Sequence, residues 1–148
     1  MNLLFVCSGN TCRSAMAEAL AKKVARRRGI DDVNVSSAGT NAWDNATATD
    51  EALLVGMERD IDLTAHRARK LTSAIVSEAD LIFVMTPGHV EQVVQLGGRG
   101  KVHVIDEYTS GSPGGGITDP YGGDLDAYRQ TADVLEQELE KLFDRITT

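Results

Sequence analysis

The sequence predicts a three-layer α/β fold in which a four-stranded parallel sheet is flanked by helices. Four short apolar runs lack the alternation of a half-exposed strand, so each is interpreted as a strand buried on both faces. Segments with apolar residues at helical spacing lie between these runs and after the last one. Strands that alternate with helices form parallel sheets whose two faces the helices cover. We expect one domain over residues 1–148, because this length suffices to bury a core.

The predicted elements follow one another closely along the chain. Strands are expected at residues 3–6, 33–37, 81–84 and 102–105. The first helix places Met16, Leu20 and Val24 on one face and is expected to end at Gly29. Further helices are expected at residues 50–59, 71–79 and 87–96, and the last one carries apolar residues three or four positions apart from Tyr128 to Ile146. Residues 39–49 and 106–124 are predicted loops, and a loop as long as the second is often functional.

Charge and cysteine content exclude several classes of protein. The chain has 15 Lys and Arg against 22 Asp and Glu, a formal net charge of −7. Nucleic acids and anionic membranes need a basic surface, so we expect neither as a partner. No apolar run approaches the roughly 20 residues of a membrane span, and the N-terminus lacks the basic start of a signal peptide. Cys7 and Cys12 are too close to staple a secreted scaffold, so we expect a cytoplasmic protein with free thiols.

A polar loop at residues 7–14 joins the first predicted strand to the first helix. Unpaired backbone N–H groups at a helix N-terminus, with the helix dipole behind them, bind anions. Gly9 permits a tight turn, and Asn10 tolerates the left-handed backbone region. Arg13 adds a planar guanidinium that binds phosphate oxygens in pairs. The sequence therefore predicts a phosphate-binding loop after the first strand, although not a nucleotide-binding one, since the glycine-lysine-serine ending is absent.

Cys7 stands at the base of this predicted loop. The loop amides, the helix dipole and Arg13 all favour its thiolate form. A thiolate that faces a bound phosphoryl group is positioned for in-line displacement, and Ser14 can donate a hydrogen bond to the sulfur. The alternative is a small buried cysteine with an incidental arginine nearby, because cysteine is often only an apolar core residue.

Four segments resemble the low-molecular-weight protein-tyrosine-phosphatase family, and the resemblance covers essentially the whole chain. They match its signature loop, its general-acid loop and two further family segments: Cys7-Ser8-Gly9-Asn10-Thr11-Cys12-Arg13-Ser14, Asp119-Pro120-Tyr121, Ser36-Ser37-Ala38-Gly39 and Thr64-Ala65-His66-Arg67-Ala68-Arg69. The resemblance implies an enzyme that hydrolyses phosphorylated protein side chains through a cysteinyl phosphate and releases phosphate. We expect no cofactor and no metal, because the loop amides and Arg13 supply the positive charge that a metal supplies elsewhere.

The resemblance also implies a role for each matching residue. Cys7, Arg13 and Asp119 are the expected catalytic residues. Substrate binding is expected from the rest of the loop and from one residue near the acid: Ser8, Gly9, Asn10, Thr11, Cys12, Ser14 and Tyr121. Asn10, Ser37 and His66 are expected to hold the loop by hydrogen bonds, with Asn10 at positive φ. Trp43 is expected either to form a pocket wall or simply to pack, whereas His89 and His103 match no family position, and the histidines show no metal-ligand spacing.

The expected acid, Asp119, completes the chemistry. A leaving group must be protonated as its bond to phosphorus breaks, and neither Cys7 nor Arg13 can supply that proton. Asp119 can supply it and then, as a carboxylate, activate the water that hydrolyses the cysteinyl phosphate. The alternative is an ordinary Asp-Pro turn. The neighbouring acidic residues are expected to be solvated or to cap helices: Asp106, Glu107, Asp124 and Asp126.

Thr11 bears on which phosphorylated side chain is the substrate. Tyrosine phosphatases of the family usually carry Ile or Leu at this position, as an apolar wall for a phenyl ring. Thr11 and the pair Gly122-Gly123 resemble the bacterial protein-arginine-phosphatase branch more closely. A β-branched polar residue fits a flat guanidinium and offers it a hydroxyl. We therefore expect phosphoarginine as the substrate, with phosphotyrosine as the alternative.

Other classes agree less well with the sequence. Arsenate reductases share the loop and the fold, but they need resolving cysteines downstream, and none follows Cys12. A silent phosphoprotein-binding module would lack the nucleophile, the arginine or the acid, and this chain has all of them. Cys12 itself is expected either to pack within the loop or, as the family resemblance implies, to trap oxidised Cys7 in a reversible disulfide.

Overall fold

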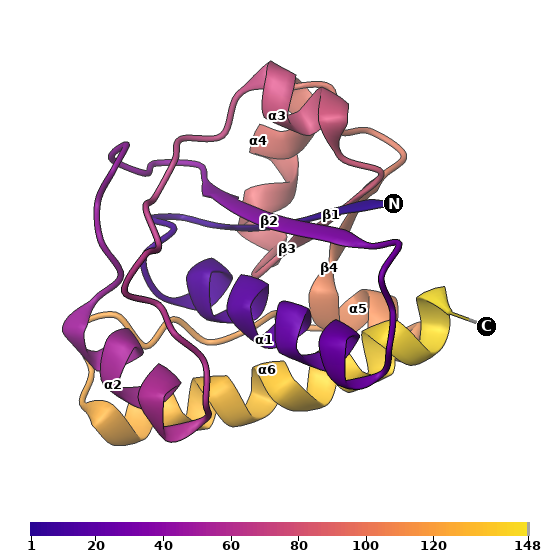
Figure 1. Cartoon of the computed structure of the whole chain (residues 1–148). Coiled ribbons are helices and arrows are strands. Elements are labelled where there is room, and N and C mark those ends of the chain that lie inside the picture. The colour runs from indigo at the N-terminus through magenta and orange to yellow at the C-terminus, as the bar shows by residue number, and fades with distance from the viewer. Residues whose placement is uncertain (148) are drawn as a thin grey trace.

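A computed structural model describes residues 1–147 as a parallel sheet between two layers of helices (Figure 1). The sheet contains four strands, all parallel, in the order β2-β1-β3-β4. Their bounds are β1 (Asn2–Cys7), β2 (Asn34–Gly39), β3 (Leu81–Val84) and β4 (Val102–Val104). The predicted fold class is therefore confirmed, with the predicted loop directly after β1.

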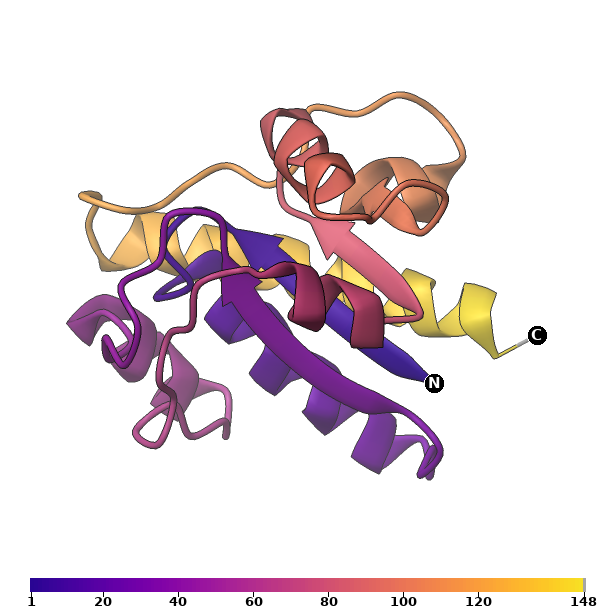
Figure 2. The same ribbon diagram turned by 90° about the horizontal axis from the view of Figure 1, so that it is seen from above.

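The helices divide between the two faces of the sheet. They are α1 (Arg13–Arg27), α2 (Asp50–Glu58), α3 (Ser73–Glu78), α4 (Val90–Gln95), α5 (Ile105–Ser110) and α6 (Leu125–Ile146), with a 3-10 turn η1 (Pro87–His89) before α4. The views in Figures 1 and 2 place α1, α5 and α6 on one face and α3 and α4 on the other. Helix α6 packs along α1, and α2 packs against α6.

Several predicted boundaries were wrong. Ile105 begins α5 instead of ending β4, and residues 106–110 continue that helix although they were predicted as loop. Asp106 and Glu107 lie in its first turn, where acidic side chains complement the helix dipole, and Gly111, at φ 75, ends it. The long loop before α6 therefore spans only residues 111–124.

Two helices are also shorter than predicted. The helix expected at residues 71–79 spans Ser73–Glu78, because the Thr72 side chain caps it by accepting a hydrogen bond from the Ile75 N–H. The helix expected at residues 87–96 is divided into η1 and α4. Helix α6 begins where the Asp124 carboxylate accepts from the Ala127 N–H, so the expectation that Asp124 is solvated or caps a helix is confirmed as capping.

Residues of β1 contribute alternately to two hydrophobic cores. Leu3, Phe5 and Cys7 face the core that α1 and α6 cover, whereas Leu4 and Val6 face the one beneath α3 and α4. A strand buried on both faces has no polar side to alternate, which explains the continuous apolar run in the sequence. The same alternation aims Cys7, at the end of the strand, toward the N-terminus of α1.

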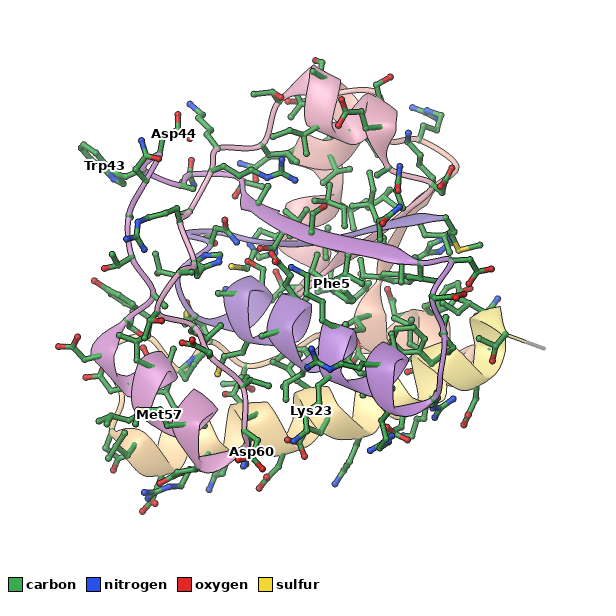
Figure 3. The ribbon with its side chains drawn as sticks, in the orientation of Figure 1. Phe5, Lys23, Trp43, Asp44, Met57 and Asp60 are labelled. Carbon is green, nitrogen blue, oxygen red and sulfur yellow. The ribbon has the colours of Figure 1, made fainter. Side chains whose placement is uncertain are left out.

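The sticks in Figure 3 show how differently the large apolar side chains are placed. Phe5 lies between the sheet and α1 and is completely buried, whereas Trp43 and Met57 project outward and are 84% and 70% exposed. Within residues 1–147, no helix combines the length and the apolar composition that crossing a membrane requires.

Candidate active site

The loop between β1 and α1 forms the floor of a pocket at the carboxyl edge of the sheet. Because β2 and β3 lie on opposite sides of β1, this edge is a topological switch point, where α/β proteins bind ligands. The pocket has a volume of about 380 Å³. Its lining combines the loop, the segment after β2 and the segment before α6: Cys7, Ser8, Gly9, Thr11, Cys12, Arg13, Asn41, Trp43, Ala46, Asp119 and Tyr121.

Cys7 ends β1, and its sulfur receives two short polar contacts. Its Sγ lies 2.9 Å from the Ser14 Oγ, and the backbone N–H of Asn10 donates to it at 3.3 Å. No side chain caps the first turn of α1 within the described residues, so the N–H groups of that turn remain available to a ligand. The Ser14 contact expected from the sequence is therefore present.

Asn10 is the centre of the hydrogen-bond network that holds the loop. It is completely buried, with φ at 57°. Its Nδ2 donates to the Ser14 Oγ at 2.8 Å and to the Ser37 Oγ at 2.9 Å. Its Oδ1 accepts from the Arg69 N–H at 3.0 Å, and its backbone carbonyl lies 2.6 Å from the His66 Nε2. Asn10, Ser37 and His66 thus lie together, although each comes from a different segment.

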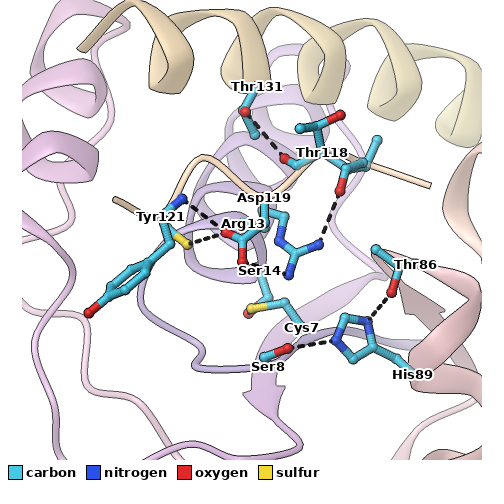
Figure 4. Close-up of polar contacts among 12 residues, drawn as sticks. Cys7, Ser8, Arg13, Ser14, Thr86, His89, Thr118, Asp119, Tyr121 and Thr131 are labelled. Carbon is cyan, nitrogen blue, oxygen red and sulfur yellow. Dashed lines mark hydrogen bonds and ion pairs between the residues drawn. The ribbon is translucent and has the colours of Figure 1, made fainter. Parts of the chain in front are cut away.

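Arg13 and Asp119 meet across the pocket (Figure 4). The Arg13 side chain is only 4% exposed, and its Nη2 lies 3.5 Å from the Asp119 Oδ2. Its Nη1 donates to the backbone carbonyl of Ile117 at 3.0 Å, which orients the guanidinium. Asp119 is 48% exposed and its Oδ1 accepts from the Tyr121 N–H at 3.0 Å. The carboxylate is therefore open to the pocket while the arginine is fixed behind it.

Cys12 lies beside Asp119 but in a different electrostatic setting from Cys7. Its Sγ donates a hydrogen bond to the Asp119 Oδ1 at 3.8 Å. Burial, and next the nearby Cys7, raise the pKa of the Cys12 thiol to about 12. Cys12 therefore remains a neutral thiol near pH 7, which makes it unsuited to act as the nucleophile. Both cysteines are free and buried.

The rim of the pocket is aromatic and exposed. Trp43 is 84% and Tyr121 is 71% exposed, and both belong to the pocket lining together with Thr11. For Trp43, the expectation of a pocket wall agrees with this exposure better than the expectation of simple packing, because a packed indole would be buried. Within residues 1–147, no group of three or more His, Cys, Asp or Glu side chains is arranged to hold a metal ion.

Sequence reasoning missed two groups at the site. His89, at the end of η1, lies 2.9 Å from the Ser8 Oγ through its Nε2. Nothing local in the sequence indicates this contact, because the two residues lie on different strand-to-helix connections. The Ile117 carbonyl that holds Arg13 was also missed, since a backbone group carries no signature in the sequence. A third histidine, His103, lies away from the pocket, where its ring packs near Phe83 and Tyr108.

Comparison with known proteins agrees with this geometry. A protein-arginine-phosphatase of Bacillus subtilis is 44% identical over 144 residues, which are 96% of this chain and 94% of that protein. A low molecular weight protein-tyrosine-phosphatase, PtpB of Staphylococcus haemolyticus, is 38% identical, over 96% of this chain and 97% of its own length.

Solved structures give the same result. A structure of a YwlE arginine phosphatase mutant with a phosphorylated active-site serine superposes with a TM-score of 0.95 at 43% identity, covering 100% of this chain and 97% of the other. The sequence profile described as "Low molecular weight phosphotyrosine protein phosphatase" matches residues 2–148. With a cysteine, an arginine and a carboxylate gathered in one pocket after β1, this chain belongs to the low molecular weight phosphotyrosine protein phosphatase family.

Proposed function

We propose that this chain is a protein-arginine phosphatase. The observation that carries the proposal is a pocket in which Cys7, Arg13 and Asp119 meet beside Thr11. The names of two relatives, both protein-arginine-phosphatases, support the same substrate. A flat guanidinium fits between the β-branched Thr11 and Asp119. In its protonated form, the Asp119 carboxyl group can accept a hydrogen bond from the guanidinium through its carbonyl oxygen and then donate its proton to the leaving nitrogen.

The first step transfers the phosphoryl group to Cys7. The Cys7 thiolate attacks phosphorus in line with the leaving nitrogen, while Arg13 and the loop N–H groups hold the equatorial oxygens. The bond from phosphorus to nitrogen breaks, and its electron pair takes the proton that Asp119 donates. Arg13 is suited to this task because the Ile117 carbonyl, which accepts from its Nη1, already fixes its orientation.

The second step releases phosphate. Asp119, now a carboxylate, removes a proton from a water molecule that attacks the cysteinyl phosphate. The sulfur leaves as a thiolate, and the Ser14 hydroxyl, 2.9 Å from it, stabilises the departing charge. The positive charge needed in both steps comes from Arg13 and the loop amides, so the proposed mechanism uses no metal.

The decisive experiment compares two phosphopeptides of matched sequence, one with phosphoarginine and one with phosphotyrosine. We expect a higher kcat/KM for phosphoarginine, and a strong preference for phosphotyrosine would overturn the substrate assignment. Thr11→Ile should shift the preference toward phosphotyrosine, because it replaces a hydroxyl with an apolar wall. Thr47→Ile is the matched control, since Thr47 is exposed and is absent from the pocket lining.

Protein-tyrosine phosphatase activity is the second candidate function. The exposed aromatic side chains of Trp43 and Tyr121 on the pocket rim favour it, because both can stack on a phenyl ring. The same peptide comparison decides between the two substrates.

An Asp119→Ala variant distinguishes either enzyme from a phosphoprotein-binding module without activity. We expect it to accumulate phosphorylated Cys7 during the slowed hydrolysis, whereas a binding module would never form that adduct.

We also propose that Cys12 protects Cys7 from oxidation by forming a reversible disulfide with it. Both cysteines line the same pocket, which supports the proposal. Activity lost to peroxide should return with a thiol reductant in the wild type but not in Cys12→Ser. Equal recovery in both proteins would assign Cys12 to packing alone.

Two free thiols of this kind suit a reducing compartment, and we place the enzyme in the cytoplasm with phosphorylated proteins, not nucleic acids, as partners.

A further inference from the structure

A hydrogen-bonded chain of three side chains ends at the pocket, and the mechanism above does not use it. The Thr86 Oγ1 lies 3.0 Å from the Nδ1 of His89, and the Nε2 of His89 lies 2.9 Å from the Ser8 Oγ (Figure 4). Ser8 lies directly after Cys7 and lines the pocket. Both ring nitrogens of His89 are therefore engaged, and the chain links the turn after β3 to the loop that binds the phosphoryl group.

The imidazole of His89 is neutral near pH 7. His89 is 6% exposed, and this burial, followed by the positive charge of Arg13, lowers its pKa. Asp119 acts in the opposite direction and is the weakest of the three influences. A neutral imidazole has one N–H donor and one bare nitrogen acceptor, so the two nitrogens of His89 must play different parts.

Two arrangements of protons satisfy these contacts, and they differ in what Ser8 presents to the pocket. If Thr86 donates to Nδ1, then the Nε2–H donates to the Ser8 Oγ, and the Ser8 O–H is free to donate into the pocket. If Nδ1–H donates to Thr86, then Nε2 accepts the Ser8 O–H, and only oxygen lone pairs face the pocket. Lone pairs directed at the anionic oxygens of a phosphoryl group are repulsive, whereas an O–H donor is attractive.

We propose that His89 is a positioning residue that, with Thr86, directs the Ser8 hydroxyl proton toward the phosphoryl oxygens. The Thr86 hydroxyl is available for this role, because it lies at the N-cap of η1 yet makes no capping bond there and contacts His89 instead. The inference rests on the proposed phosphatase chemistry of this pocket, but it does not depend on which phosphorylated side chain is the substrate. A hydrogen bond to a charged oxygen is worth about a tenfold change or more in affinity or rate.

The proton arrangement is measured directly by the ¹⁵N shifts of the His89 ring in the wild-type protein with inorganic phosphate bound. We expect the form protonated at Nε2. The form protonated at Nδ1, or a doubly protonated ring, would overturn the proposal. Thr86→Val removes the hydrogen bond that the bare Nδ1 accepts, so the ¹⁵N shift of Nδ1 should move further away from that of a protonated nitrogen, and an unchanged Nδ1 shift would contradict the role given to Thr86. This measurement needs no catalytic turnover, so it also tests the inference if neither phosphopeptide is hydrolysed.

A double-mutant cycle tests whether His89 acts through Ser8. We expect Ser8→Ala and His89→Leu each to lower kcat/KM, and the affinity for inorganic phosphate, by about tenfold. His89→Leu should cause no further loss when Ser8 is already alanine. His89→Gln should recover most of the activity, because its amide N–H reaches the place of Nε2. Losses that multiply in the double variant, or a Gln variant as impaired as Leu, would assign His89 a merely structural role.

The matched control is His103→Leu, a histidine on β4 that lies outside the pocket lining. It should leave kcat/KM and phosphate affinity unchanged. If the His89→Leu protein does not fold, the kcat/KM of His89→Gln and the His89 ring ¹⁵N shifts of Thr86→Val still decide the question. Failure of the wild type to hydrolyse any phosphopeptide would refute the proposed function, whereas the wrong ring proton would refute only this inference.

Discussion

Replacing Asn10 with alanine removes three side-chain hydrogen bonds from a completely buried position. The lost partners are the Ser14 hydroxyl at 2.8 Å, the Ser37 hydroxyl at 2.9 Å and the Arg69 N–H at 3.0 Å. The substitution also leaves an alanine at φ 57°, a backbone region that β-carbons disfavour. Both effects destabilise the folded state, and they can be separated by a second substitution at the same position.

The expected magnitudes follow from these contacts. Three hydrogen bonds at about 1 kcal/mol each, plus about 1 kcal/mol for the left-handed backbone, give a loss of about 4 kcal/mol for Asn10→Ala. Asn10→Gly avoids the backbone term and should cost about 3 kcal/mol, if the greater freedom of unfolded glycine is left aside. Asn45 provides the matched control, because it is also at positive φ, 71°, but is exposed. Asn45→Ala should cost only the backbone term of about 1 kcal/mol.

The free energy of unfolding is measured from urea titrations followed by far-UV circular dichroism. Circular dichroism is preferred to fluorescence because the tryptophan, Trp43, is already 84% exposed in the folded protein. The activity of Asn10→Ala should also fall, since the N–H of residue 10 that faces the Cys7 sulfur is no longer held in place. If Asn10→Ala and Asn45→Ala lose the same stability, the hydrogen-bond network does not support the loop and the reasoning is refuted.

Three further predictions concern the same site. Gly116 and Gly122 both have positive φ, 85° and 81°, but a Cβ at Gly116 would collide with the Met85 carbonyl, whereas a Cβ at Gly122 would meet no neighbouring atom. In urea titrations, Gly116→Ala should therefore lose about 3 kcal/mol of unfolding free energy and Gly122→Ala about 1 kcal/mol. Equal losses would contradict the packing argument. Burial raises the pKa of Cys12 from 9.0 to about 12, so as the pH rises the unfolded chain loses this proton before the folded protein does, and the free energy of unfolding should fall between those values. Urea titrations of Cys12→Ala over the same range should show a shallower fall. An identical fall would show that Cys12 ionises equally in both states. Arg13→Lys keeps the charge but loses the planar fork, so kcat/KM should fall by about a hundredfold in the phosphopeptide assay, and wild-type kinetics would show that charge alone is sufficient.

The elements that depend on neighbouring residues could be predicted from the sequence. The buried run of β1 and the three-to-four spacing along α6 are local patterns, and both predicted the observed structure. The loop after β1 could be predicted in the same way, because Cys7, Arg13 and the N-terminus of α1 lie within a few residues of one another in the sequence. The error at α5 has the opposite cause, since a helix of only six residues leaves too few positions for a periodic pattern.

The full site needed the tertiary structure. The sequence alone predicted the fold class and the loop that carries Cys7 and Arg13, and, through the family resemblance, it predicted Asp119 as the acid. Only the packing of distant segments decided that the Ile117 carbonyl orients Arg13, that Asp119 lies 3.5 Å from that arginine, and that His89 contacts Ser8. The order β2-β1-β3-β4 brings the turn after β3, with His89, beside the loop after β1, and the Ile117 N–H donates to the Met85 carbonyl just after β3, which brings the segment of Asp119 to the same place. Strand order results from the packing energy of the whole sheet, and no short segment of the chain encodes it.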